Sequence, residues 1–137
     1  MTEFSWPIRV YYEDTDAGGV VYYANYLKFM ERARTEMLRV IGFEQDRLKQ
    51  EQDVIFAVHS MQVHYHKPAA FNDELTVISQ ICERAKASLT FDQRIMRNHD
   101  QQLLCSAQIR VACLRASRFA AMAIPADIKQ RIDEVWH

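Results

Sequence analysis

The order of helical and strand patterns is the feature that most constrains the fold of this chain. Residues 22–41 carry one helical apolar stripe, and Gly42 follows it as a stop signal. The stripe consists of Tyr23, Tyr26, Leu27, Met30, Met37, Leu38 and Ile41. Period-two alternation, typical of half-buried strands, covers residues 8–13, 54–66, 74–84, 88–97 and 103–115. Strands segregated from one long helix in this way predict an α+β fold, with an antiparallel sheet curled around that helix.

The connections between these patterns are short, which indicates one compact unit. Residues 98–100 read as a hairpin turn, and Pro125 begins a short C-terminal helix that we expect to end near Trp136. Residues 44–53 carry no clear pattern. With only three glycines and three prolines and no linker, we expect a single domain over residues 1–137.

A single sheet on one helix leaves its outer face and its edge strands uncovered. Unpaired backbone groups along an exposed strand favour pairing with another chain. We therefore expect a homo-oligomer, either a dimer or a tetramer.

The charge and hydropathy of the chain exclude several classes of protein. Seventeen basic and eighteen acidic residues give a net charge of -1, which does not favour nucleic acid as a partner. The N-terminus lacks the pattern of a secretory signal, and no apolar run reaches the length of a transmembrane segment. We expect a cytoplasmic protein.

The cysteine and histidine residues indicate neither a metal centre nor a disulfide framework. Cys82, Cys105 and Cys113 are odd in number and lie in apolar strand patterns, so we expect buried, reduced thiols. His64 and His66 share a strand face but have no evident third ligand. Because dinucleotide, P-loop and serine-hydrolase motifs are also absent from the sequence, we predict no cofactor and no metal.

The segment that joins the first strand pattern to the helix contains the residues best suited to catalysis. Asp16 precedes the pair Gly18 and Gly19, which let the backbone turn closely around a ligand. The unpaired N–H groups of the helix start come next, and these stabilise an anion or a polarised carbonyl oxygen. The alternative is that Asp14 and Asp16 are ordinary turn and capping residues.

The same segment carries a resemblance to a known enzyme family. Residues 9–22 (RVYYEDTDAGGVVY) resemble the active-site signature of the 4-hydroxybenzoyl-CoA thioesterase family. Together with residues 31–38 (ERARTEML), they are similar to its Tol-Pal-system-associated acyl-CoA thioesterase subfamily. The likeness extends over nearly the whole chain and implies a hotdog fold.

The resemblance implies an acyl-CoA thioesterase acting on short or medium chains. Asp16 matches the catalytic aspartate of the family, as a nucleophile or a general base, and the backbone N–H of Tyr23 in the first helical turn matches the group that polarises the thioester carbonyl. Some relatives carry a histidine at the Tyr23 position, so only the amide role is implied. A hotdog hydratase is disfavoured because this loop contains no histidine.

Further residues are candidates for substrate binding. We expect the two glycines, Tyr22 and Tyr26 to line the acyl site, and Lys86 to meet the phosphates of coenzyme A. Acyl carrier protein is an alternative thioester donor. The competing function is a weakly catalytic binding partner of acyl carrier protein or of phospholipid-synthesis enzymes.

Two charged residues of the helix are expected to form ion pairs. Arg34 lies within the apolar stripe, where a charge needs a partner, and we expect that partner to be Glu13 or Asp14. Glu31 lies on the flank of the stripe. We expect it to pair with an arginine, and a second catalytic carboxylate is the alternative.

Overall fold

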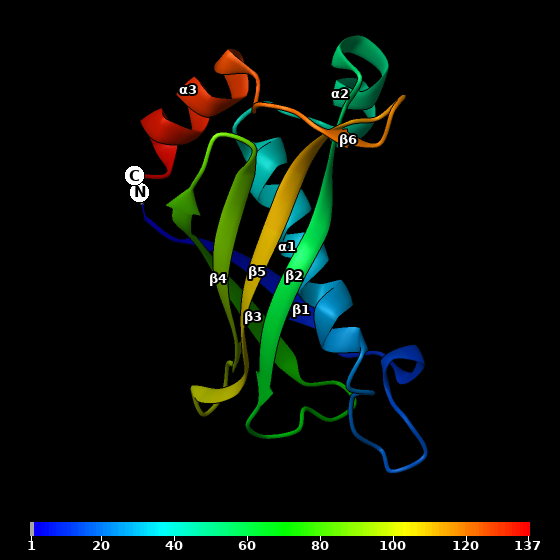
Figure 1. The fold of residues 1–137 in the computed structure, drawn as a ribbon. Coiled ribbons are helices and arrows are strands. Elements are labelled where there is room, and N and C mark those ends of the chain that lie inside the picture. Colours follow the sequence, from blue (N-terminus) through cyan, green and yellow to red (C-terminus); the bar gives the residue numbers. More distant parts are fainter. Residues whose placement is uncertain (1) are drawn as a thin grey trace.

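The computed structural model describes residues 2–137 and contains a curled antiparallel sheet with three helices (Figure 1). The sheet has the strand order β1-β3-β4-β5-β2, and a short strand, β6, pairs with β5. Its strands are β1 (Phe4–Arg9), β2 (Val54–Tyr65), β3 (Glu74–Arg84), β4 (Ser88–Arg97), β5 (Gln102–Arg115) and β6 (Ala120–Ala121). The helices are α1 (Asn25–Val40), α2 (Gln45–Gln52) and α3 (Ala126–Val135). The predicted antiparallel sheet is confirmed.

The long strands and two helices agree with the sequence patterns, but two predictions about local structure are wrong and one helix was not predicted. The first strand runs from Phe4 to Arg9, so it begins earlier than expected and tolerates Pro7 because β1 is an edge strand. Residues 12–14 form a 3₁₀ turn instead of continuing the strand. Residues 45–52 lacked a clear pattern but form α2. The described chain therefore contains a helix besides α1 and the C-terminal helix.

The core lies between α1 and the inner face of the sheet. Phe29, Met30 and Ala33 of α1 are fully buried, and α1 packs against β1 and β3. Alternate residues of β5 are buried beneath it, as period two requires. Helix α3 closes one end of this core through Trp136, whose ring meets Phe4 edge to face, so the two chain ends lie close together (Figure 1).

The burial of the cysteines and the end of α1 were also predicted from the sequence. Cys105 and Cys113 are buried, and burial raises the pKa of both thiols, that of Cys105 to about 11. Cys82 is exposed, so its predicted burial is wrong. Gly42 follows the end of α1 with φ +102°, a conformation that favours glycine and confirms the predicted stop.

Neither a membrane-spanning helix nor a cluster of metal ligands is present in residues 2–137. No helix there is both long enough and apolar enough to cross a bilayer. No group of three or more His, Cys, Asp and Glu side chains within the same residues is arranged as metal ligands would be.

Candidate active site

A buried carboxylate attaches the loop of residues 11–22 to the start of α1. Asp14 accepts hydrogen bonds from the backbone N–H of Tyr11 at 2.8 Å and from the side-chain amide of Asn25 at 3.1 Å. Asn25 is the first residue of α1 and is itself buried. Because both ends of this interaction are removed from water, it fixes the 3₁₀ turn of residues 12–14 against the helix.

The loop that follows Asp14 folds back as a narrow ribbon and places Asp16 at its exposed turn. The backbone N–H of Asp16 donates to Val20, and the N–H of Gly19 donates to the carbonyl of Asp16. Thr15 and Val21 form an antiparallel bridge. The N–H of Val21 also donates to the carbonyl of Ala69, so backbone bonds hold the ribbon at its base.

The two glycines of the loop suit its geometry in different ways. The Asp16 carboxylate accepts a hydrogen bond from the Gly18 N–H at 2.8 Å, and a Cβ on Gly18 would lie 3.2 Å from the same carboxylate oxygen. Gly19 has φ +80°, which side chains rarely adopt. The glycine pair therefore lets the backbone turn tightly beside the carboxylate of Asp16.

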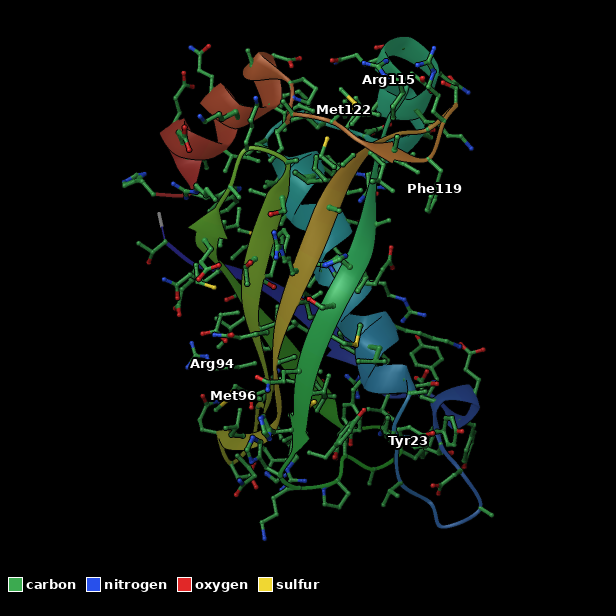
Figure 2. All side chains as sticks on the ribbon, in the orientation of Figure 1. Tyr23, Arg94, Met96, Arg115, Phe119 and Met122 are labelled. Carbon is green, nitrogen blue, oxygen red and sulfur yellow. The ribbon has the colours of Figure 1, made fainter. Side chains whose placement is uncertain are left out.

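The amide expected to polarise a carbonyl lies just before α1 rather than in its first turn. Tyr23 belongs to a turn, Ala24 is the N-cap residue, and α1 begins at Asn25. Among residues 2–137 no hydrogen bond uses the N–H of Tyr23, so this donor is open to a ligand. Figure 2 labels Tyr23 beside the lower end of α1, next to the loop.

A tyrosine that the sequence analysis did not single out supports this turn. The hydroxyl of Tyr65, at the end of β2, donates to the carbonyl oxygen of Tyr23 at 3.2 Å, and the two rings meet edge to face. Burial raises the pKa of Tyr65. Only its position on the apolar side of the β2 alternation was visible in the sequence.

Tyr23 and Tyr26, both predicted site residues, line one hollow between α1 and the end of β2. Its walls are formed by Val21, Tyr23, Tyr26, Tyr65, His66, Lys67 and Pro68. Tyr26 is buried, and its hydroxyl oxygen accepts a hydrogen bond from the Ala69 N–H at 3.0 Å. Burial raises the pKa of the Tyr26 hydroxyl. Tyr22 is exposed beside Tyr23, with ring centroids 4.8 Å apart.

Lys86 is not brought near Asp16 within one chain. It lies in the turn between β3 and β4, where its carbonyl oxygen accepts a hydrogen bond from the Ile124 N–H. The loop of Asp16 adjoins the opposite end of β3, because the N–H of Val10 donates to the carbonyl of Asp73. The length of β3, eleven residues or about 35 Å at the usual rise per residue, therefore separates them.

The two predicted ion pairs of α1 are absent from the described residues. Arg34 does not reach Glu13 or Asp14; its Nη1 donates to the side-chain oxygen of Gln93 at 2.9 Å. Glu31 accepts a hydrogen bond from the Thr35 hydroxyl at 3.0 Å, and no arginine in residues 2–137 forms a salt bridge with it. Both predictions fail because the partners depend on which strands face α1.

Comparison with known proteins places this geometry in a family. The model of the thioesterase-like superfamily matches residues 10–132, which include the loop, α1 and the whole sheet from β2 onward. The chain belongs to the thioesterase-like superfamily. Its superfamily relatives include the acyl-CoA thioesterase YbgC of Haemophilus influenzae, 45% identical over 126 residues that cover 92% of this chain and 91% of that protein.

Two further comparisons concern a relative in sequence and a solved structure of similar fold. The acyl-CoA thioester hydrolase YbgC of Escherichia coli O6:H1 is 47% identical over 127 residues, which cover 93% of each chain. The solved structure of 4-hydroxybenzoyl CoA thioesterase from Pseudomonas sp. strain CBS-3 superimposes with a TM-score of 0.89 at 21% identity, over 96% of this chain and 99% of that chain. At that identity the structural likeness concerns the fold, and it confirms the predicted hotdog thioesterase-like architecture.

Proposed function

We propose that residues 1–137 form a single hotdog thioesterase domain that hydrolyses short- to medium-chain acyl-CoA thioesters to a free acid and coenzyme A. The observation that carries the proposal is the near full-length similarity to two proteins named as acyl-CoA thioester hydrolases. The exposed carboxylate of Asp16 and the open N–H of Tyr23 supply the chemistry. Membership of the Tol-Pal-associated subfamily and a cytoplasmic location are parts of the same proposal.

Asp16 and the Tyr23 amide have complementary roles in this reaction. The Tyr23 N–H donates to the thioester carbonyl oxygen and stabilises the negative charge that develops there. Asp16 either attacks the carbonyl carbon, giving a mixed anhydride that water then cleaves, or removes a proton from the attacking water. Coenzyme A leaves as a thiolate, which needs little acid assistance because an alkyl thiol has a pKa of about 8.5.

The remaining predicted residues would hold the substrate around these two groups. Gly18 and Gly19 keep the loop free of side chains beside Asp16. Tyr22 and Tyr26 would contact the acyl group or the pantetheine arm from the start of α1. The geometry favours this role because Tyr26 lines the same hollow as Tyr23.

Self-association through β2 would complete the site. This edge strand exposes apolar side chains, among them Val58 at 45%, Met61 at 41% and Tyr65 at 48%. A two-fold axis across β2 would pair it antiparallel with its copy, so that each strand start lies beside the other strand's end. Lys86 of the partner subunit would then approach the Asp16 end of this chain and meet the phosphates of coenzyme A. A dimer, or a tetramer of two such dimers, is the expected assembly.

Thiol release from a series of acyl-CoA chain lengths tests the proposal. We expect hydrolysis by the wild-type protein and a loss of at least about 100-fold in kcat for Asp16→Asn, since the amide neither attacks carbon nor accepts the proton. Glu13→Gln, an exposed neutralisation in the same loop, is the matched control and should retain activity. Acyl carrier protein thioesters belong in the same panel as the alternative donors.

Two results would contradict the proposal. Wild-type rates in Asp16→Asn would remove Asp16 from the mechanism. Absence of thiol release from every thioester, together with binding of acyl carrier protein, would instead favour the weakly catalytic binding partner.

A further inference from the structure

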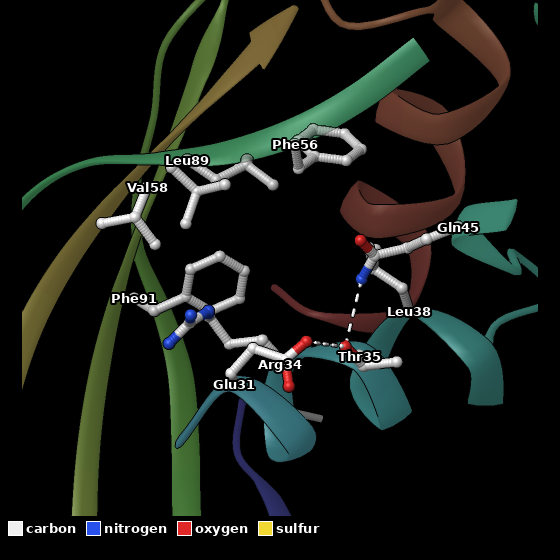
Figure 3. A pocket seen from close by; sticks show the side chains of 10 residues that line it. Glu31, Arg34, Thr35, Leu38, Gln45, Phe56, Val58, Leu89 and Phe91 are labelled. Carbon is white, nitrogen blue, oxygen red and sulfur yellow. Dashed lines mark hydrogen bonds between the residues drawn. The ribbon is translucent and has the colours of Figure 1, made fainter. Parts of the chain in front are cut away.

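A second cavity lies along the same helix, farther from the loop. Glu31, Arg34, Thr35 and Leu38 of α1 form one wall, with Gln45 beside them, and Phe56, Val58, Leu89, Phe91 and Val111 of the sheet form the other (Figure 3). Its volume is about 100 Å³. Because a cavity of about 150 Å³ accommodates benzene, this space admits a group of about four or five heavy atoms.

The cavity wall formed by the sheet is apolar, whereas polar side chains line the helical side, and the guanidinium group of Arg34 lies on that side (Figure 3). Arg34 is partly buried, and burial lowers its pKa while the charge of Glu31 opposes that shift. Its Nη1 is held by Gln93, but none of the residues described forms a salt bridge with it or accepts from its Nε or Nη2. The cation is therefore only partly satisfied in a largely apolar space.

Arg34 is held in place by a buried network rather than by solvent. Gln93 is fully buried, and its side-chain amide donates to the carbonyl oxygen of Met30 at 3.0 Å and to the hydroxyl of Ser79 at 2.8 Å. This arrangement leaves Gln93 only one orientation in which its oxygen accepts from Arg34. The guanidinium donors are thus presented at a fixed position in the cavity wall.

The other polar groups of the cavity are already engaged. Thr35 donates to Glu31 and accepts from Gln45 at 3.2 Å, as Figure 3 draws. Glu31 is exposed, so water weakens, without removing, the attraction of its charge for Arg34. Arg34 consequently remains the one described group there that is both positively charged and open to a partner.

The cavity is within reach of the reaction centre in the dimer proposed above. Along one chain, Arg34 lies about 16 Å from Tyr23, beyond the end of a short acyl group. Pairing of two β2 strands brings the Phe56 end of one subunit beside the Tyr65 end of the other. Arg34 of the partner subunit would then stand across the seam from Asp16 and Tyr23.

We propose that this cavity receives the distal end of the acyl group and that Arg34 binds a terminal carboxylate there, which makes short dicarboxylic acyl-CoA thioesters substrates. The inference rests on the proposed function and names a substrate class for the same site. The fork of Nε and Nη2 presents two N–H groups to the two carboxylate oxygens, the geometry in which arginine binds carboxylates most strongly. The apolar walls then enclose the methylene groups of the chain.

The test compares two thioesters of nearly the same shape, glutaryl-CoA and 5-methylhexanoyl-CoA, with 5-hydroxypentanoyl-CoA as a third. We expect the wild-type kcat/KM to favour glutaryl-CoA over 5-methylhexanoyl-CoA by about 10- to 100-fold, as for a hydrogen-bonded charge. Arg34→Met should reduce this ratio to one or below, Arg34→Lys should restore part of it, and Arg32→Met on the same helix should leave it unchanged. A ratio measured within one protein cancels any loss of folded enzyme, and a blank without enzyme subtracts spontaneous hydrolysis.

Binding of the same thioesters to Asp16→Asn protein, measured by titration calorimetry with and without Arg34→Met, gives the comparison without turnover. An Arg34-dependent preference in binding would support the inference even if no thioester were hydrolysed, in which case the proposed function alone would fail. Preference for the methyl-ended thioester, or a ratio that survives Arg34→Met, would overturn the role of Arg34. Preference for the hydroxyl over the carboxylate would overturn the substrate class.

Discussion

The attachment of the loop of residues 11–22 to α1 by Asp14 leads to a prediction about stability. Asp14→Ala removes a buried carboxylate that accepts from the Tyr11 N–H and from the Asn25 amide, and it leaves both donors without a partner. A hydrogen bond to a charged group contributes about 1.5–3 kcal/mol. Because the carboxylate itself regains hydration on unfolding, we take the lower value for each bond and expect a loss of about 3 kcal/mol in the free energy of unfolding.

Urea denaturation followed by fluorescence or circular dichroism measures this loss. Protein concentration must be the same for both proteins, since an oligomer's stability depends on it. At this chain length 3 kcal/mol corresponds to a fall in Tm of about 10 °C. Glu13→Ala changes an exposed acid in the same turn and should stay within about 0.5 kcal/mol of wild type.

Measuring both the stability and the kcat of Asp14→Ala distinguishes a role of Asp14 in holding the loop from a role in the reaction. If Asp14 positions the loop, Asp14→Ala should also lower kcat under conditions where the protein is fully folded, because the loop that carries Asp16 then moves. A loss below about 1 kcal/mol would refute the argument that the buried Asp14 carboxylate holds the turn through both hydrogen bonds. Full stability with a strongly reduced kcat would instead assign Asp14 to the reaction itself.

Three further predictions follow from the site and the loops. Tyr65→Phe removes the hydroxyl that supports the turn before α1, so kcat in the thiol-release assay should fall about 2- to 12-fold with little change in KM. Gly18→Ala should lower kcat by more than about tenfold while leaving the urea midpoint nearly unchanged, since the added Cβ lies 3.2 Å from the Asp16 carboxylate. The Arg97 hydrogen bond lowers the pKa of Asp100 from 3.8 to about 2. The folded-state pKa is the lower one, so stability from this pair is present above pH 4 and lost as pH falls towards 2; Asp100→Asn should abolish this pH dependence in urea unfolding.

The strands of the sheet were predictable from the sequence because buried and exposed side chains alternate along them with period two. β3 and β4 have the predicted bounds, and β5 begins one residue earlier than expected. The buried inner face and the more polar outer face alternate along each of these strands, which is a local property of the chain.

The elements that were missed have a weak or ambiguous local signal. Helix α2 buries only Leu48 among its eight residues, so it has almost no apolar stripe to detect. The 3₁₀ turn of residues 12–14 continues an apparent alternation from β1. Its conformation depends instead on the buried Asp14, which accepts a hydrogen bond from Asn25 at the start of α1. In both segments tertiary interactions, rather than periodicity, decide the backbone conformation.

For the candidate site, residues adjacent in sequence were predictable and pairs distant in sequence were not. Asp16, Gly18 and Gly19 lie within four residues, so a tight turn beside a carboxylate could be inferred from their spacing alone. Tyr65 reaches Tyr23 across 42 residues, and Gln93 reaches Arg34 across 59. Such pairs could not be predicted because they depend on which strands lie next to one another in the sheet.

The sequence by itself determined the alternation of each strand, the helix that follows the glycine-containing loop, and the tight turn beside Asp16 that precedes this helix. Each is a local property, set by side-chain periodicity and by the conformations that glycine permits. The tertiary structure decided that Arg34 binds a buried glutamine and faces a cavity instead of pairing with an acid of the loop. The reason is the strand order β1-β3-β4-β5-β2, which places β4 beneath the middle of α1 and keeps the loop at the helix start.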